Sequence, residues 1–315
     1  MCKRVEGGNE VSTFSQKEFH CEQVFNELGL VWHLYTDGTK MVNVFCGGEE
    51  KTLVMTAIAV EEKLSEDIII ITFEIMENHL HMILAGEHDR CLDFFARLKR
   101  RIIRLFSSAE KIVDWSMFQA SILLIDNLKS LRNEIVYVNR NAFVASPEYT
   151  PYNYLWGGGF AYFNPVVSLL PAVNVAQLGC NRARNLTKFR DVAKLSDLKF
   201  VADMAFIPSF CRIDIGEMLF RDARSYFGLL TRNAEAFSLI AQKLQDVIFM
   251  TDDELMAVAV KYASTNFCNG QLTLLQADQK VQIAKELHFK YNATNQQLRR
   301  MLKMDLKILQ ELFPI

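Results

Sequence analysis

The stretch from Ile68 to Ala85, IIIITFEIMENHLHMILA, constrains the fold more than any other part of the chain. Two apolar runs that suit β-strands flank a polar junction at Glu77-Asn78. Side chains two residues apart on a strand project from the same face, so His79 and His81 are expected side by side, with Leu80 turned the other way into a core. Two imidazoles on a rigid scaffold suit a divalent metal ion. The stretch therefore predicts a strand pair that carries part of a metal site.

The segments around this stretch predict an α+β domain. A strand is expected at Leu30–Thr36 and, after an Asp37-Gly38 turn, another at Lys40–Cys46. Apolar residues at helical spacing predict helices at Glu49–Leu64, His88–Phe106 and Asp126–Phe143. The order strand, helix, strand, strand, helix, helix favours an antiparallel sheet backed by helices.

The two ends of the chain differ from this central part. Residues 1–27 are a polar N-terminal segment, expected to be loosely ordered. The loop Thr150–Pro165 is rich in Tyr, Pro and Gly and is the most natural domain boundary, which places a first domain at residues 28–165. A helical domain is expected at residues 171–315, with helices near Asp191–Phe206, Asp214–Leu229, Asn233–Gln245, Asp252–Phe267 and Ala277–Phe289.

The C-terminal segment, about residues 277–313, has the pattern of a helix-turn-helix. A helix at Ala277–Tyr291 is followed by a short turn, and Thr294 with Gln297 forms a capping-box signature that starts a second helix. On the second helix Leu298, Met301 and Leu302 are expected to face inward. The outward face is predicted to carry Gln296, Arg299, Arg300 and Lys303. Such a helix is suited to enter the major groove of DNA.

The net charge and the cysteine content narrow the kinds of binding surface and of structural cross-link that the sequence allows. The formal net charge is −2, so any nucleic-acid surface must be local. The helix at His88–Phe106 supplies one such surface through Arg97, Lys99, Arg100, Arg101 and Arg104. The seven cysteines form no CxxC pair, which argues against structural zinc and a disulfide framework and favours a reducing cytoplasm. A signal peptide and a stretch of transmembrane length are both missing, so no membrane association is expected.

The helix before the Tyr/Pro/Gly loop supplies what the histidine pair lacks. Tyr137 and Asn141 are four residues apart and therefore lie one turn apart on one face. Brought up to the His79-x-His81 strand, they complete a site in which the two imidazoles and the Asn141 carbonyl oxygen hold Mg²⁺ or Mn²⁺. The metal would polarise a phosphodiester and the Tyr137 phenolate would attack phosphorus. His33 is expected to be a core or supporting residue rather than a ligand.

In these residues the chain resembles the HUH single-strand transposases with one catalytic tyrosine, and within them the REP-associated tyrosine transposases. The resemblance covers roughly residues 28–160 and depends on the order and spacing of several pieces. These pieces are VWHLYTDG (31–38), ENHLHMIL (77–84), FFARLKRRIIRLF (94–106), LRNEIVYVNRNAF (131–143) and PYNYLW (151–156). The last forty residues are similar to the helix-turn-helix of replication initiators of the DnaA type.

The resemblance implies a ferredoxin-like sheet and a metal-dependent nick in single-stranded or hairpin DNA. It implies His79, His81 and Asn141 as metal ligands and Tyr137 as the nucleophile of a 5′-phosphotyrosine link, followed by strand transfer. Two positions depart from the family pattern: Ala142 replaces a proline, and Gly157-Gly158-Gly159 replaces a serine-rich stretch. Binding of duplex DNA through the helix-turn-helix and formation of a homodimer are two further possibilities.

Two other functions compete with a transposase. One is a domesticated, catalytically silent relative that binds palindromic DNA. The other is a metal-dependent hydrolase that uses water as the nucleophile. Covalent trapping separates them, because only tyrosine attack joins the protein to DNA.

Overall fold

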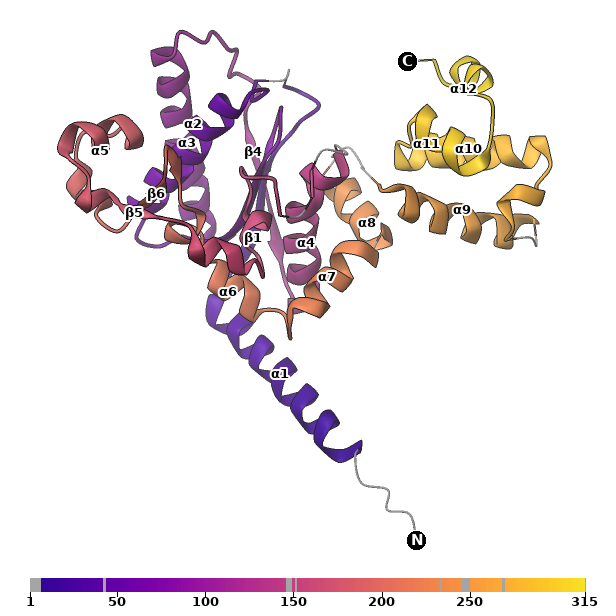
Figure 1. The fold of residues 1–315 in the computed structure, drawn as a ribbon, viewed down its shortest axis with the longest axis horizontal. Helices are drawn as coiled ribbons and strands as arrows, with labels where there is room; N and C mark the ends of the chain where they lie inside the picture. The colour runs from indigo at the N-terminus through magenta and orange to yellow at the C-terminus, as the bar shows by residue number, and fades with distance from the viewer. Residues whose placement is uncertain are drawn as a thin grey trace. The chain divides into compact units, whose positions relative to one another are not determined.

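A computed structural model describes residues 7–41, 44–145, 149–150, 152–232, 234–244, 250–267 and 270–314. The chain divides into two compact units (Figure 1). Unit 1 comprises residues 1–143 and 148–231, and unit 2 comprises residues 144–147 and 232–315. Each unit is described by itself.

A four-stranded antiparallel sheet forms the centre of unit 1. Its strands are β1 (Val31–Thr36), β2 (Ile69–Ile75), β3 (Leu80–Ala85) and β4 (Ala120–Ile125), in the order β2-β3-β1-β4. Helices α2 (Gly48–Lys63) and α3 (His88–Ser108) cover one face, and α4 (Leu128–Ala145) lies on the other face (Figure 1). The predicted α+β class is confirmed at this level, because both the antiparallel sheet and its helices are present.

Alternation along the central strands separates an apolar core from a polar cluster. Leu34 and Met82, which are paired across β1 and β3, are fully buried apolar side chains. Their neighbours in sequence, His33 and His81, project to the opposite face, as expected for a period of two. On that face the two imidazoles contact each other, with ring centroids 5.1 Å apart.

The outer edge of β2 is covered by later parts of unit 1. The Ile75 amide donates to the Trp156 carbonyl (3.0 Å), and Glu74 forms a bridge with Gly157. Near the start of β2, the Arg212 amide donates to the Ile70 carbonyl at 2.8 Å. These bonds satisfy backbone groups that an open sheet edge leaves unpaired.

The rest of unit 1 contains short elements and one long helix. They are α1 (Gly7–Leu28), β5 (Val173–Asn174), α5 (Cys180–Thr187), β6 (Lys199–Val201), β7 (Met204–Ala205), α6 (Ile213–Met218) and α7 (Ala223–Arg232). The strands β5, β6 and β7 form a second, three-stranded sheet in that order.

Unit 2 is helical in its described residues. Its helices are α8 (Ala234–Leu244), α9 (Asp252–Phe267), α10 (Ala277–Tyr291), α11 (Asn295–Leu302) and α12 (Leu306–Leu312). Between α10 and α11, Asn292 adopts a left-handed conformation (φ 51°) that ends the first helix. The Thr294 side chain accepts from the Gln297 amide, so the predicted capping box is confirmed.

Three expectations about secondary structure were wrong. A second strand at Lys40–Cys46 does not form in the described residues 40–41 and 44–46, because β3 and β4 already occupy both edges of β1; residues 42–43 lie outside the described part. The α-helix expected at Asp191–Phe206 is not formed: a short 3-10 helix at Val192–Leu195 is followed by β6 and β7, which are joined by a turn at Ala202 with φ 52°. The segment expected to be loosely ordered forms α1 over residues 7–28, anchored where Glu18 pairs with Arg132 (2.7 Å).

Two further differences concern how far a predicted helix and a predicted domain extend along the sequence. The helix predicted at Asp214–Leu229 is divided into α6 and α7. Unit 1 also continues well beyond the predicted boundary after Pro165, because residues 148–231 pack with residues 1–143. Residues 233 and 245, the ends of the helix predicted at 233–245, lie outside the described part.

In the part of the chain that the structure describes, no helix is both long enough and apolar enough to cross a membrane.

Candidate active site

The histidine pair lies where the strand pattern predicts it. His79 immediately precedes β3 and His81 is its second residue. Their ring centroids are 4.8 Å apart and the rings are nearly perpendicular, at 89°. Both side chains are buried, so the β2–β3 hairpin holds two imidazoles in contact within the fold.

Each histidine is held through its Nδ1 atom by a different partner. His79 Nδ1 lies 2.7 Å from the Asn78 Oδ1 atom, and Asn78 Nδ2 donates to the Gly38 carbonyl at 2.7 Å. His81 Nδ1 lies 3.0 Å from the Nε2 atom of His33. The other nitrogen of His33, Nδ1, is 2.8 Å from Glu134 Oε2 on α4. The rings are therefore fixed by hydrogen bonds as well as by packing.

Helix α4 brings Tyr137 to the same cluster. The Tyr137 ring lies 5.8 Å from the His81 ring at 90°, and 6.3 Å from the His33 ring. Leu131 and Ile135 on α4 are fully buried, which fixes the side of the helix that faces the sheet. The predicted meeting of the tyrosine helix and the histidine strand is present in this geometry.

Asn141 occupies the next turn of α4, and its side chain is 95% buried. Its Nδ2 atom has no hydrogen-bond partner among the residues that the structure describes. Leaving a buried amide unsatisfied costs about 1–3 kcal/mol, which calls for a functional explanation. The i, i+4 spacing stacks Asn141 over Tyr137 on α4, while the ring contacts of the cluster join His33, His79, His81 and Tyr137.

Side chains of these chemical types can bind a small divalent cation. Two imidazoles and an amide oxygen are ligands that Mn²⁺ accepts, with water at the other positions. Among the described residues, no group of three or more His, Cys, Asp and Glu side chains is arranged to hold a metal ion. The candidate set contains only two such residues, His79 and His81, and its third member is the amide side chain of Asn141.

Glu74 is the buried carboxyl group nearest to this cluster in the sheet register. It is paired with His81 across β2 and β3, and its Oε1 accepts from the Ala142 amide at 3.1 Å. Burial raises the pKa of Glu74 well above its usual range, although the Ala142 hydrogen bond and Lys51 oppose the shift. The Glu74 side chain therefore stays protonated, and so uncharged, at pH values above the ordinary pKa of a glutamate. It lies opposite His81 in the sheet.

The other tyrosines of the loop have packing roles. Tyr154 is buried against Met76 and Ala142, and its hydroxyl donates to the Ile75 carbonyl. Tyr149 packs against Tyr154, whereas Tyr152 is exposed and contacts the Phe227 ring. The ring contacts of these three tyrosines are with one another and with Trp156 and Phe227.

The basic residues of α3 do not form one exposed face. Arg101 is buried, its Nε donates to Glu61 Oε1 (2.6 Å), and its guanidinium lies over the Phe189 ring. Arg97 is half-buried and donates to Ser65 Oγ at 2.7 Å. Arg100 and Arg104 are exposed, and Lys99 is partly exposed. The expectation that Arg101 lies on a DNA-binding surface was wrong, because the i, i+4 pair Arg97 and Arg101 shares the Glu61 carboxylate.

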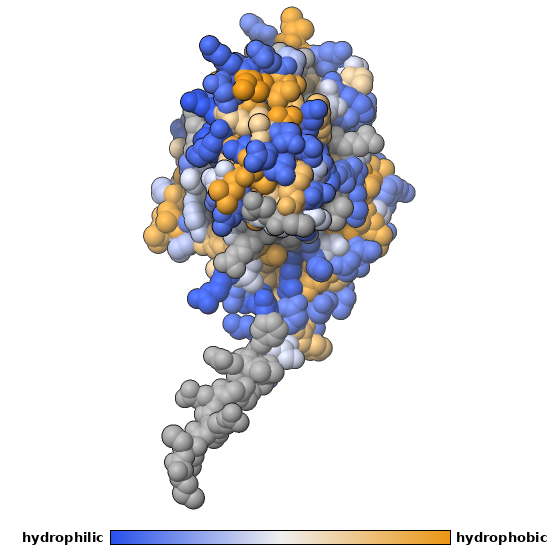
Figure 2. All heavy atoms as spheres, turned by 90° about the vertical axis from the view of Figure 1, so that its right-hand side faces the viewer, coloured by the Kyte–Doolittle hydropathy of each residue, from blue (hydrophilic) through white to orange (hydrophobic). Residues whose placement is uncertain are grey.

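The predicted outer face of the second helix agrees with the burial pattern of α11. Leu298, Met301 and Leu302 are buried. The exposed residues are Gln296, Arg299, Arg300 and Lys303. Arg300 also forms a two-pronged ion pair with Asp252 of α9, at 2.7 and 2.9 Å. Figure 2 shows one face of the molecule, on which hydrophobic patches are interspersed among hydrophilic residues.

Two residues that support the histidines, Asn78 and Glu134, have no role in the site that the sequence pattern predicts. Asn78 was interpreted as part of a strand junction, and Glu134 was not singled out. Glu134 lies three residues before Tyr137 and so shares its helix face, which is the signal that could have identified it. His33 was expected to be a supporting residue, and its contacts with His81 and Glu134 agree with that.

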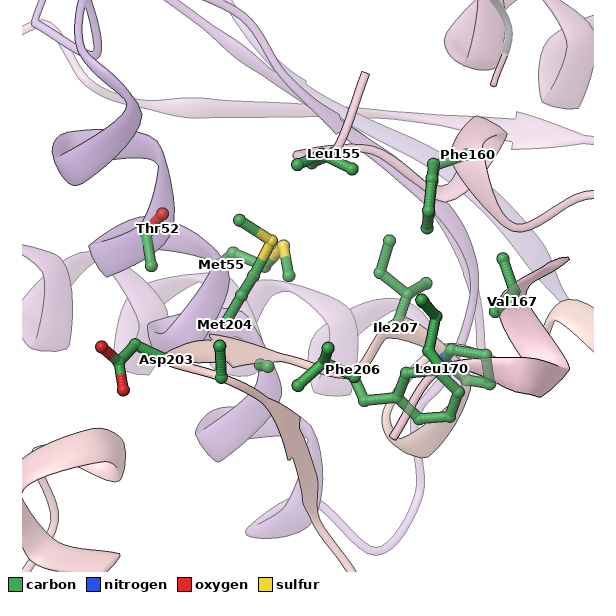
Figure 3. A pocket seen from close by; sticks show the side chains of 14 residues that line it. Thr52, Met55, Leu155, Phe160, Val167, Leu170, Asp203, Met204, Phe206 and Ile207 are labelled. Atoms are coloured by element: carbon green, nitrogen blue, oxygen red, sulfur yellow. The ribbon is translucent and has the colours of Figure 1, made fainter. Parts of the chain in front are cut away.

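A separate apolar cavity lies elsewhere in unit 1 (Figure 3). It has a volume of about 470 Å³ and is lined by α2 and by segments 155–170 and 201–208. Met55, Met204 and Phe206 supply apolar side chains, while Asp203 lies at one end of the labelled group in the close-up. None of the histidine, tyrosine or asparagine residues of the candidate active site lines this cavity.

Comparison of the chain with protein-family models, with curated proteins and with solved structures finds no match.

Proposed function

We propose that this protein is a tyrosine transposase that nicks and rejoins single-stranded DNA through a 5′-phosphotyrosine intermediate. The observation that carries the proposal is the contact of Tyr137 with His81, which itself contacts His79. A tyrosine beside two metal-competent imidazoles suits nucleophilic attack on a phosphodiester better than it suits packing alone.

The arrangement of elements around this contact supports the same class. The order β1-α2-β2-β3-α3-β4 with strands arranged β2-β3-β1-β4 is the ferredoxin-like topology, which we propose as the HUH nuclease domain of this chain. His81 lies on the inner strand β3 and His79 immediately precedes it, while Tyr137 lies on α4, the helix that follows β4. A substrate phosphate would thus meet groups supplied by two rigid elements.

The residues have distinct roles in the proposed reaction. His79, His81 and the Asn141 amide oxygen would hold Mg²⁺ or Mn²⁺, which when bound would polarise the scissile phosphate and neutralise its charge. The Tyr137 oxygen loses its proton and bonds to phosphorus, and the bond from phosphorus to the 3′ oxygen breaks. The 3′ oxygen takes up a proton and leaves as a free hydroxyl, which a reverse attack can rejoin.

A covalent-adduct assay tests this function. The protein is incubated with pooled single-stranded hairpin oligonucleotides and Mn²⁺ and then analysed on a denaturing gel. We expect a shifted band that is lost with chelator and with Tyr137→Phe, which removes only the attacking oxygen. Tyr152→Phe is the control, because Tyr152 is exposed and away from the histidines, and it should keep the band. A band that persists in Tyr137→Phe would remove the tyrosine mechanism.

One observation favours a second candidate, a catalytically silent DNA-binding protein of the same type. His81 is fully buried, and His79, Tyr137 and Asn141 are each no more than 5% exposed. A substrate phosphate can reach these groups only if the covering residues move. Binding of hairpin DNA with no adduct for any oligonucleotide would favour this second candidate.

A further inference from the structure

Two hydrogen-bonded chains end on the candidate metal ligands. The first runs from the Gly38 carbonyl through the Asn78 side chain to His79 Nδ1. The second runs from the Glu134 carboxylate through His33 to His81 Nδ1. We propose that these chains fix both His79 and His81 as the tautomer with the proton on Nδ1, so that Nε2 presents its lone pair to a divalent cation. The inference rests on the proposed function and assigns Asn78, His33 and Glu134 as positioning residues.

The direction of the first chain follows from the donors and acceptors present. A backbone carbonyl only accepts, so the Asn78 amide nitrogen must face Gly38. The Asn78 oxygen therefore faces His79, and an amide oxygen also only accepts. His79 Nδ1 must then carry the proton, which leaves Nε2 as the basic nitrogen of the neutral ring.

The second chain is longer but has the same logic. A carboxylate oxygen accepts a hydrogen bond, so His33 Nδ1 donates to Glu134 Oε2. The Nε2 atom of a neutral His33 is then an acceptor and takes the hydrogen bond from His81 Nδ1. His81 is thereby protonated on Nδ1 as well. Partners of this kind orient metal-binding histidines and raise their basicity.

The substitution Glu134→Gln tests the direction in which the hydrogen bonds from Glu134 through His33 to His81 are donated, and keeps a side chain that can form them. A glutamine amide can donate to His33 Nδ1, which lets the hydrogen bonds reverse and moves the His81 proton to Nε2. Asn78→Asp keeps an acceptor beside His79, whereas Asn78→Leu removes it. A purely structural role predicts no change of tautomer in any of these variants.

The experiment measures tautomers and metal affinity separately. Nitrogen-15 NMR of histidine-labelled, metal-free protein reports which nitrogen of each ring is protonated, and calorimetry with Mn²⁺ alone gives the affinity. We expect Nδ1 protonation of both rings in the wild type. For Glu134→Gln and His33→Phe we expect a shift of His81 toward Nε2 protonation and Mn²⁺ affinity lower by about 10–100-fold. For Asn78→Leu we expect the same at His79, with recovery in Asn78→Asp.

The matched control is Glu61→Gln, which alters a buried carboxylate that pairs with Arg101 between α2 and α3. It should lower the free energy of unfolding without changing either tautomer or the Mn²⁺ affinity. Nε2 protonation in the wild type would overturn the inference. Unchanged tautomers and affinities in Glu134→Gln and Asn78→Leu would also overturn it. If the expected tautomers and Mn²⁺ affinities are found but no DNA adduct forms, the proposed function fails while the inference stands.

Discussion

At the scale of single residues, the candidate site depends on close packing around His79. A Cβ atom added at Gly38 would lie 2.7 Å from His79 Nδ1 and 3.3 Å from Asn78 Nδ2. Such a distance is below van der Waals contact, so the imidazole or the turn must move. A side chain at position 38 would therefore compete for space with the His79 imidazole.

We predict that Gly38→Ala displaces the His79 ring and lowers the affinity for Mn²⁺ by about 10-fold or more, as for other changes to residues that orient a ligand. Calorimetry measures the affinity, and circular dichroism checks that the fold is kept. Gly179→Ala is the control, because nothing lies within 4 Å of a Cβ atom there. Equal affinities in the two variants would contradict the packing argument.

Glu74 gives a prediction about pH at the same scale. Because burial raises its pKa in the folded protein, folding takes up a proton. The stability that this group contributes is fully present below its ordinary pKa of 4.5 and is lost as the pH rises through the higher folded value. Glu74→Gln keeps an oxygen that can accept from the Ala142 amide, so it should lose less stability than the wild type as the pH rises above 4.5.

Urea unfolding at several pH values measures this difference. The exposed Glu22→Gln is the control and should leave the pH dependence as in the wild type. If the stability curves of Glu74→Gln and the wild type stayed parallel, the proton uptake would have to be assigned to another group.

At the scale of elements, the two arginines Arg299 and Arg300 on α11 have different environments, which the sequence alone could not show. Both are exposed, but Arg300 is engaged by Asp252, whereas Arg299 has no ion pair with any described residue. Releasing Arg300 for a phosphate would break a charge-assisted pair, so its net gain on DNA binding is smaller. Arg299 is thus the better candidate for a phosphate contact if α11 binds duplex DNA.

We predict that Arg299→Ala weakens duplex binding several-fold and reduces the salt dependence by about one counterion. Arg300→Ala should have a smaller effect, and single-strand nicking should change little in either. Fluorescence anisotropy over a range of salt concentrations gives both quantities. An unaltered affinity and salt slope in Arg299→Ala would count against a helix-turn-helix role for α10 and α11.

At the scale of the molecule, the sheet of unit 1 also contacts residues far beyond those of the candidate site. The Tyr162 hydroxyl donates to the Ile71 carbonyl (2.9 Å), the Arg212 amide donates to the Ile70 carbonyl (2.8 Å), and Phe210 packs on Phe73. These contacts protect the outer edge of β2. The segment that follows Pro165 is therefore part of the folding unit that carries the site.

We predict that a chain ending at residue 231 retains one cooperative unfolding transition for unit 1. A chain ending at residue 165 should be less stable by several kcal/mol or should aggregate, because it exposes the β2 edge and the apolar residues beneath α6. Urea unfolding and light scattering compare the two chains. Equal stability would show that residues 166–231 do not support the sheet.

Much of the candidate site could be predicted from local pattern. The alternation around His79 and His81 and the helical spacing of Tyr137 are properties of neighbouring residues, so they appear directly in the sequence. The same holds for the inner and outer faces of α11. The environment of Arg101 could not be predicted, because its partner Glu61 is forty positions away on another helix.

The sequence by itself thus determined the α+β class, the main helices and the strand pair that carries the histidines, since periodicity specifies which side chains share a face. The tertiary structure alone decided that both edges of β1 are paired, that residues 199–205 form strands, and that unit 1 extends to residue 231. It also decided that Glu134, His33 and His81 form one hydrogen-bonded chain. These features depend on partners distant in the sequence, and the free energy of such contacts exists only once the chain has folded.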